Sequence, residues 1–207
     1  MDNPVDIHPL FPKVVAHTKI DLLHVEQKQL DDLYNTVPFC KTRPFDKENV
    51  VEMSESLDIM TDLPFLKSKV LDTFNNFKNK MMRYETTNFK MTTSWFTKTA
   101  QGQYNGFHKH GNQDYSMVYY FSNSEPVEIT FEDFSPGHNR EFTTSEDNPL
   151  NRGAVTFEMK NNELIIFPSE VYHKIQPFTG EGVRKSIAMN LTATGEFGFG
   201  DSKINVI

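Results

Sequence analysis

The chain has 207 residues, a formal net charge of −7 and a sequence pI near 5.5. This length allows one well-buried core and is short for two, so we expect a single domain over residues 1–207. The acidic balance lacks the clustered lysine and arginine with which proteins neutralise phosphates, which argues against nonspecific nucleic-acid binding.

The single cysteine, Cys40, excludes an internal disulfide framework, and the N-terminus shows no signal-peptide pattern. No apolar run in the sequence approaches the roughly 18 residues that a membrane span needs. We therefore expect a cytoplasmic protein that makes no membrane contact.

Two segments of the first half have the apolar periodicity of helices, residues 25–34 and residues 64–82. Thr61 or Asp62 is expected to cap the second helix, and Pro64 suits its first turn. Residues 1–88 are thus predicted to form a helical supporting region that packs on a sheet.

From Phe89 onward the sequence consists of short runs rich in aromatic and β-branched residues, separated by turn residues. These runs predict eight strands, at residues 89–98, 104–110, 115–121, 127–131, 155–159, 163–167, 172–176 and 185–192. Eight strands without intervening helices favour a mainly β fold, a double-stranded β-helix or jelly roll, with the helices on one sheet. We assign residues 89–194 to this core and 195–207 to a tail. The long polar segment 135–152 is either a lid or disordered.

Three histidines are candidates for a metal site. His108 and His110 stand two positions apart near a strand end, where alternation places both on one face. His173 follows a predicted strand and lies far away in sequence but adjacent in a barrel. Two neighbouring ligands and one distant ligand are a common metal-site layout. The structural alternatives are polar-loop histidines and a hydrogen-bonded strand histidine.

The last predicted core strand has one polar face. Arg184, Ser186, Ala188 and Asn190 share it by alternation, and apolar side chains occupy the other face. The planar fork of an arginine suits a carboxylate, and the Ser186 hydroxyl can reach the same oxygens. The alternative is a surface strand with an ordinary salt bridge at Arg184.

Four segments together resemble the 2-oxoglutarate and Fe(II)-dependent oxygenases common in marine bacteria and their phages, within the prolyl-hydroxylase-like superfamily. The resemblance covers about half of the chain, from residue 95 to residue 190, and residues 9–12 look like that family's start. The segments are Asn105–His110, Ser116–Phe121, Leu164–Ser169 with His173, and Arg184–Asn190.

The resemblance implies a dioxygenase that binds Fe(II), 2-oxoglutarate and dioxygen, with ascorbate as a candidate auxiliary reductant. It implies hydroxylation of an unidentified substrate with release of succinate and CO2. His108 and His173 match the two family histidines, and Arg184 matches the anchor for the distal carboxylate of 2-oxoglutarate. Tyr120, Ser186 and Asn190 are the residues expected to assist Arg184 in binding the co-substrate. Because Tyr119 and Tyr120 alternate, only one of these two rings can face the cavity.

The chain departs from the wider superfamily at the third ligand, where most members have a carboxylate two residues after the first histidine. Here that residue is His110. The third ligand is then His110, which we favour, or Asp114, which requires the adjoining turn to curl back. Asn112 is expected to be a turn residue.

Two other classes stay open on the sequence alone. A cupin-type metalloenzyme that does not use 2-oxoglutarate would explain the histidines as metal ligands but would not explain Arg184. A noncatalytic jelly-roll module leaves all of these residues incidental. Trp95 and Tyr104 are candidates for the substrate pocket, with core packing as the alternative. The substrate is a small molecule or a peptidyl residue, a homodimer stays open, and the expected location is the cytoplasm of a bacterial or phage-infected cell.

Overall fold

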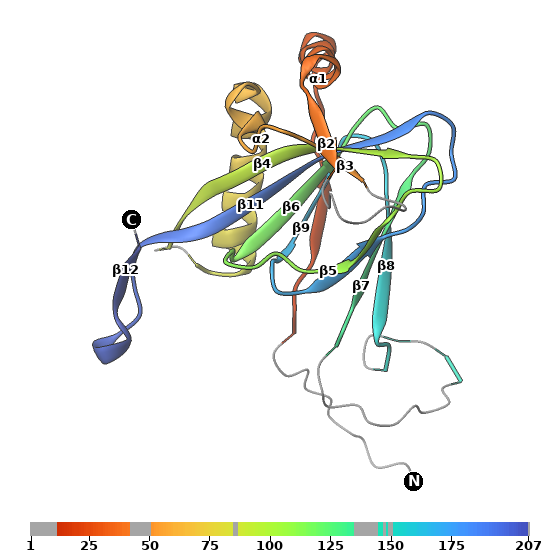
Figure 1. The fold of residues 1–207 in the computed structure, drawn as a ribbon. Helices are drawn as coiled ribbons and strands as arrows, with labels where there is room; N and C mark the ends of the chain where they lie inside the picture. The colour runs from red at the N-terminus through yellow and green to blue at the C-terminus, as the bar shows by residue number, and fades with distance from the viewer. Residues whose placement is uncertain are drawn as a thin grey trace.

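The computed structural model describes residues 12–41, 51–84, 87–134, 145–146, 148 and 151–206 of the protein. Two antiparallel sheets face each other, and helices cover the outer side of the larger sheet (Figure 1). The larger sheet has the order β1-β9-β6-β11-β4-β3-β2, with β12 paired to β11, and the smaller has the order β5-β10-β7-β8. The predicted mainly β fold with N-terminal helices is confirmed.

The larger sheet holds eight strands and the smaller sheet four. The strands of the larger sheet are β1 (Ala16–Lys19), β2 (Phe39–Lys41), β3 (Glu52–Ser54), β4 (Asn88–Ala100), β6 (Tyr115–Tyr120), β9 (Glu163–Pro168), β11 (Val183–Phe197) and β12 (Ile204–Val206). The strands of the smaller sheet are β5 (Asn105–His108), β7 (Val127–Glu132), β8 (Ala154–Met159) and β10 (Tyr172–Ile175).

All eight predicted strands are present, most with ends one or two residues from the predicted ones. Two differences affect the argument. β5 ends at His108, so the prediction that a strand extends to His110 is wrong. β11 continues to Phe197 because its backbone pairs with β4 as far as Thr194 and then with β12. The short strands β1, β2, β3 and β12 were not predicted, since three or four residues are too few for an alternating pattern to be recognised.

Two helices precede the main strands. α1 (His24–Thr36) and α2 (Pro64–Asn76) lie where the periodicity predicts them, and α2 continues into a single π-helical turn, η2 (Phe77–Met81). Pro64 does occupy the first turn, but the expected side-chain cap is absent. Thr61 is the last residue of the preceding 3-10 turn, η1 (Ile59–Thr61), and Asp62 follows it as the C-cap. The Thr61 hydroxyl donates to Asp58 Oδ2 and does not cap α2.

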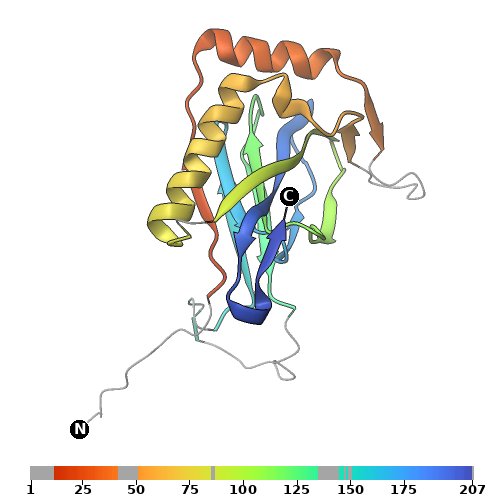
Figure 2. The same ribbon diagram turned by 90° about the vertical axis from the view of Figure 1, so that its left-hand side faces the viewer.

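One apolar core lies between the helices and the larger sheet. α2 lies over the outer face of the larger sheet (Figure 2). Leu66, Val70 and Phe74 of α2 are buried in one cluster with Met117 of β6 and Ile187 of β11. Burying such a side chain completely contributes about 1.5–3 kcal/mol. The helices therefore hold the larger sheet from outside, which leaves its inner face free to line a cavity.

A second core fills part of the space between the two sheets. It contains Val118, Ile165 and Ala188 of the larger sheet packed against Ile129 and Phe131 of β7. The predicted alternation along β11 is confirmed, because the apolar residues of one face join the helix-side core while Arg184, Ser186 and Ala188 line the cavity on the other. The polar face of β11 thus points between the sheets.

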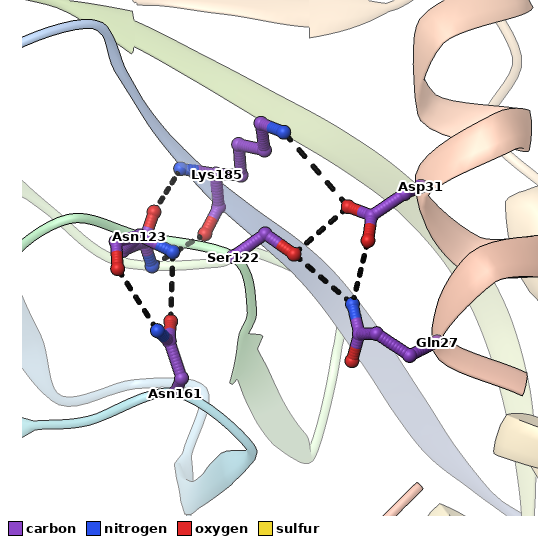
Figure 3. A network of polar contacts seen from close by, with 6 residues as sticks. All are labelled: Gln27, Asp31, Ser122, Asn123, Asn161 and Lys185. Atoms are coloured by element: carbon purple, nitrogen blue, oxygen red, sulfur yellow. Dashed lines mark hydrogen bonds and ion pairs between the residues drawn. The ribbon is translucent and has the colours of Figure 1, made fainter. Parts of the chain in front are cut away.

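A polar network ties α1 to the turns at one end of the sheets (Figure 3). Asp31 accepts a hydrogen bond from Ser122, and Asn123 bonds the backbone of Lys185 through both its side-chain oxygen and its side-chain nitrogen. Its members are Gln27, Asp31, Ser122, Asn123, Asn161 and Lys185, none of which lines the cavity described below.

Within the described residues, the helices are too short or too polar to cross a membrane. The segment 135–152, expected to be either a lid or disordered, lies for the most part outside the described residues, as does the family-like start at residues 9–12.

Candidate metal and co-substrate site

Three histidines meet between the sheets. His173 of β10 stands directly opposite His108 of β5 in the register of the smaller sheet, and their ring centroids lie 4.2 Å apart. His110 completes the group, with its centroid 5.4 Å from that of His108 and 5.3 Å from that of His173. One nitrogen of each ring lies within 4.8 Å of the others, so the three can hold a single metal ion.

His110 is positioned by a loop, since it lies two residues beyond the end of β5. Its backbone N–H donates to the carbonyl of Ser169, 2.9 Å away, and its ring stacks on Trp95 with a centroid distance of 5.8 Å and an interplanar angle of 30°. The two histidines do share one side, as predicted, but strand alternation is not the cause.

Each ring is oriented through its Nδ1 atom. The Nδ1 of His108 lies 2.8 Å from the Gly106 carbonyl, and that of His173 lies 3.1 Å from the Val171 carbonyl. Because a carbonyl only accepts, both rings carry their proton on Nδ1, and Nε2 of each ring then has the lone pair that a metal ligand needs. His110 Nδ1 lies 2.6 Å from Oδ1 of Asn190.

Burial favours the neutral form of His110 and His173, which is the metal-binding form of an imidazole. Burial, together with the neighbouring His108, lowers the pKa of His173 to about 3. Burial also lowers the pKa of His110. A neutral three-imidazole set suits Fe(II) among other first-row transition metals, so the residues present fit an iron site.

The histidines open into a cavity of about 530 Å³, its mouth to solvent included. It is lined by Val51, Trp95, Thr97, Thr99, Asn105, His108, His110, Val118, Tyr120, His173, Ile175, Arg184, Ser186 and Ala188. Of the expected site residues, all but Asp114, Asn190 and Tyr104 contribute to this lining.

Arg184 is a buried cation facing this cavity. Its side chain donates to the Gln176 carbonyl at 2.8 Å and lies 5.8 Å from the Phe178 ring centre. No carboxylate in the described part of the chain forms an ion pair with it, so the alternative of an ordinary surface salt bridge is wrong. Burial lowers the pKa of Arg184 to about 10, which still leaves it protonated at neutral pH. A buried charge without a counterion is costly, and an anionic ligand would offset that cost.

Tyr120 and Ser186 stand beside Arg184. The two are cross-strand partners in β6 and β11, and the Ser186 hydroxyl shares a hydrogen bond with Thr97. The Tyr120 hydroxyl is buried and has no partner among the described residues. Burial raises its pKa, so it remains a donor. Tyr119 points into the opposite, helix-side core, as alternation predicts.

We expect Tyr120→Phe to separate binding from stability. Removing an unpaired buried hydroxyl should leave the ligand-free protein as stable or up to about 1 kcal/mol more stable, measured by urea unfolding. If the hydroxyl serves an anionic ligand in the cavity, affinity for that ligand falls about tenfold. Tyr34→Phe is the matched control, because its hydroxyl is also buried and unpartnered but lies outside this cavity. Equal ligand affinity in both variants would contradict this role of Tyr120.

The structure places three expected residues elsewhere. Asp114, the alternative third ligand, accepts a hydrogen bond from the backbone N–H of Ala193 at 2.7 Å and is not in the histidine group. Tyr104 is 43% exposed and does not line the cavity. Asn190 lies behind His110 and does not touch the cavity. Asn112 has the positive φ of a turn residue, as expected.

Several lining residues were not anticipated. Thr97 and Thr99 share the parity of Trp95 on β4, a signal that was available in the sequence. Asn105 was not singled out either, although its amide nitrogen lies 3.5 Å from Nε2 of His108. Val51 comes from a loop, where no periodicity could have indicated it.

Residues 93–190 match the model of a protein family described as "Putative 2OG-Fe(II) oxygenase". This stretch contains all three histidines as well as Tyr120, Arg184 and Ser186. A comparison with curated proteins finds none whose sequence matches this chain.

Solved structures with the same fold include several such oxygenases. An oxidoreductase of the 2OG-Fe(II) oxygenase family from Burkholderia pseudomallei is 11% identical, with 87% of this chain and 84% of that chain covered and a TM-score of 0.57. HygX from Streptomyces hygroscopicus, with nickel, 2-oxoglutarate and hygromycin B bound, is 8% identical, with coverage of 87% and 83% and a TM-score of 0.59. A Pseudomonas putida prolyl-4-hydroxylase is 11% identical, with coverage of 86% and 92% and a TM-score of 0.56. At these identities the likeness establishes the fold alone.

Proposed function

We infer that the chain belongs to the 2OG-Fe(II) oxygenase family and is a 2-oxoglutarate- and Fe(II)-dependent dioxygenase. The family match covers residues 93–190, about half of the chain. The observation that carries the assignment is a buried, unpaired Arg184 that faces the same cavity as the three-histidine group. A metal site and an anion site that share one cavity are what a metal-chelated dicarboxylate co-substrate requires.

The residue roles follow from this arrangement. We propose that the Nε2 atoms of His108, His110 and His173 hold the iron, and that Arg184 binds the distal carboxylate of 2-oxoglutarate. Tyr120 is placed to donate its unpartnered hydroxyl to that carboxylate. Ser186, already bonded to Thr97, adds a second hydroxyl on the same strand face as Arg184.

When bound, the iron supplies oxidative chemistry in which dioxygen and 2-oxoglutarate are consumed and succinate and CO2 are released. The protein binds and orients the co-substrate and shields the cavity from water. Trp95 covers one face of the His110 ring, and Val118 and Ile175 make the walls apolar. Excluding water in this way strengthens the interaction of Arg184 with a carboxylate.

The two alternative classes explain less. A cupin-type enzyme that does not use 2-oxoglutarate has no need of a buried, uncompensated arginine beside the metal site. A noncatalytic module accounts neither for Arg184 nor for three imidazoles that converge on a common centre in one cavity. Both alternatives predict no metal-dependent binding of a dicarboxylate.

The finer assignments are proposals. We propose hydroxylation as the reaction, by the family resemblance, and a small molecule or a peptidyl residue as the substrate. HygX is solved with hygromycin B bound, and another structural neighbour is a prolyl hydroxylase in complex with a peptide fragment, which supports this range. Three expectations stay predictions: a cytoplasmic location, the absence of nucleic-acid and membrane partners, and any stimulation by ascorbate. A homodimer stays open.

Calorimetry under anaerobic conditions tests the function. We expect 2-oxoglutarate to bind the Mn(II)-loaded protein and to show at least tenfold weaker binding after the metal is removed with EDTA, because the co-substrate is chelated by the metal. By linkage, 2-oxoglutarate must raise the Mn(II) affinity by the same factor, which provides an internal check. A folded, Mn(II)-loaded protein that binds no 2-oxoglutarate would overturn the assignment and favour the cupin-type alternative.

A further inference from the structure

Behind His110 lies a buried chain of hydrogen bonds that the proposed chemistry does not use. Oδ1 of Asn190 lies 2.6 Å from His110 Nδ1 and 2.9 Å from the hydroxyl of Ser116. The hydroxyls of Ser116 and Ser169 lie 2.8 Å apart, and both side chains are fully buried. Nδ2 of Asn190 donates to the Thr93 hydroxyl at 2.9 Å.

The number of protons on each group determines which groups donate and which accept in this series of hydrogen bonds. An amide oxygen has none, so both His110 Nδ1 and the Ser116 hydroxyl must donate to Asn190 Oδ1. Because Ser116 gives its single hydroxyl proton to Asn190, the hydroxyl of Ser169 must donate to that of Ser116. The neutral His110 ring has one proton, and this arrangement places it on Nδ1. Nε2 is left with a lone pair.

His110 differs from the other two histidines in what sets its tautomer. His108 and His173 bond backbone carbonyls, which cannot change role. The partner of His110 is the side-chain amide of Asn190. Its oxygen accepts hydrogen bonds and its nitrogen donates them, but the two atoms are nearly the same size. Rotated by half a turn, Asn190 would present N–H groups to Nδ1 of His110, forcing the proton onto Nε2 and preventing metal ligation there.

We propose that Asn190 is a positioning residue that, with Ser116 and Ser169, holds His110 in the Nδ1–H tautomer and so keeps the histidine group ready for a metal. Ser169 also accepts the backbone N–H of His110, so one residue constrains both the backbone and, through Ser116 and Asn190, the ring. The proposal rests on the proposed role of His110 as a ligand. It also changes the expected role of Asn190 from binding the co-substrate to supporting the metal site.

Nitrogen-15 NMR of the metal-free protein tests the tautomer directly. Long-range proton–nitrogen correlations at about pH 8, where imidazoles are neutral, distinguish a protonated Nδ1 from a protonated Nε2. We expect the Nδ1–H pattern for all three histidines of the wild type. In Asn190→Ala the His110 signals shift toward the Nε2–H form, while His108 and His173 keep their pattern and act as internal controls.

Metal affinity gives a second readout that needs neither 2-oxoglutarate nor oxygen. Zn(II) affinity is expected to fall about 10- to 100-fold in Asn190→Ala, the range typical of lost support for a ligating histidine. Asn190→Asp keeps an acceptor oxygen at the same place, so its Zn(II) affinity should stay near the wild-type value. Asn123→Ala is the matched control, because it removes an asparagine from the polar network of Figure 3, away from the cavity, and should leave Zn(II) affinity unchanged.

The outcomes separate this proposal from the proposed function. A wild-type His110 protonated on Nε2, or an Asn190→Ala variant with unchanged Zn(II) affinity, would overturn the role of Asn190. The wild-type spectrum decides the tautomer even if Asn190→Ala fails to fold. A protein that shows the Nδ1–H tautomer and binds Zn(II), but never binds 2-oxoglutarate, would support this role while contradicting the oxygenase assignment.

Discussion

Arg184→Ala is expected to lower the affinity of the Mn(II)-loaded protein for 2-oxoglutarate by about 100-fold or more. Arg184 is 6% exposed and forms no ion pair with a carboxylate of the described residues. One of its nitrogens donates to the Gln176 carbonyl, and its remaining donors are available to a ligand in the cavity. Two charge-assisted hydrogen bonds to a desolvated carboxylate contribute on the order of 3–6 kcal/mol together. Anaerobic titration calorimetry measures the loss, and Mn(II) affinity without co-substrate should change less than about threefold, since Arg184 is not a ligand.

A shorter 2-oxo acid distinguishes the contribution of the metal-chelating end of the co-substrate from that of its distal carboxylate. Pyruvate has the groups that chelate a metal but lacks the distal carboxylate, so wild type and Arg184→Ala should bind it with equal affinity. Arg184→Lys keeps the charge but loses the planar fork, and we expect an intermediate affinity for 2-oxoglutarate. If Arg184→Ala weakened pyruvate binding as much as 2-oxoglutarate binding, the anchoring role would be wrong and a general disturbance of the cavity would explain the result.

His110→Ala is expected to weaken Mn(II) binding by about 100-fold or more, and Asp114→Asn to leave it within about threefold of wild type. Metal-binding free energies in protein sites are on the order of 10 kcal/mol, so one of three ligands carries several kcal/mol. The His110 ring shares a centre with His108 and His173, whereas the carboxylate of Asp114 bonds the backbone N–H of Ala193. This comparison decides between the two third ligands that the sequence left open.

The choice of asparagine at position 114 makes the control strict. Its side-chain oxygen can still accept the Ala193 N–H, so the turn keeps its hydrogen bond while the negative charge is lost. Co(II) absorption spectra add a geometric readout, because loss of a nitrogen ligand changes the visible bands and loss of a distant charge does not. The reverse pattern, with metal binding lost in Asp114→Asn and kept in His110→Ala, would make Asp114 the ligand and require the turn to rearrange.

The sequence by itself determined the two helices, the eight main strands and most of the chemistry-bearing residues. Apolar periodicity located α1 and α2, and strand composition located the eight main strands, because burial on one face imposes a repeat that local patterns reveal. Alternation assigned Arg184 and Ser186 to one face of β11 and separated Tyr120 from Tyr119 for the same reason. The three histidines stood out because imidazole pairs with a distant third partner are a recurring ligand pattern.

Only the tertiary structure decided which of these residues meet. His110 lies beyond its strand and is positioned by the Ser169 carbonyl, a contact 59 residues away in the chain that no local pattern encodes. Packing also gives the Asp114 carboxylate a backbone partner away from the histidine group, and it places Asn190 behind His110. Whether a carboxylate comes close enough to pair with Arg184 depends on all the strands around it, and among the described residues none does. Periodicity reports the face on which a side chain lies, whereas its partners come from other strands and loops, and those partners determine its role.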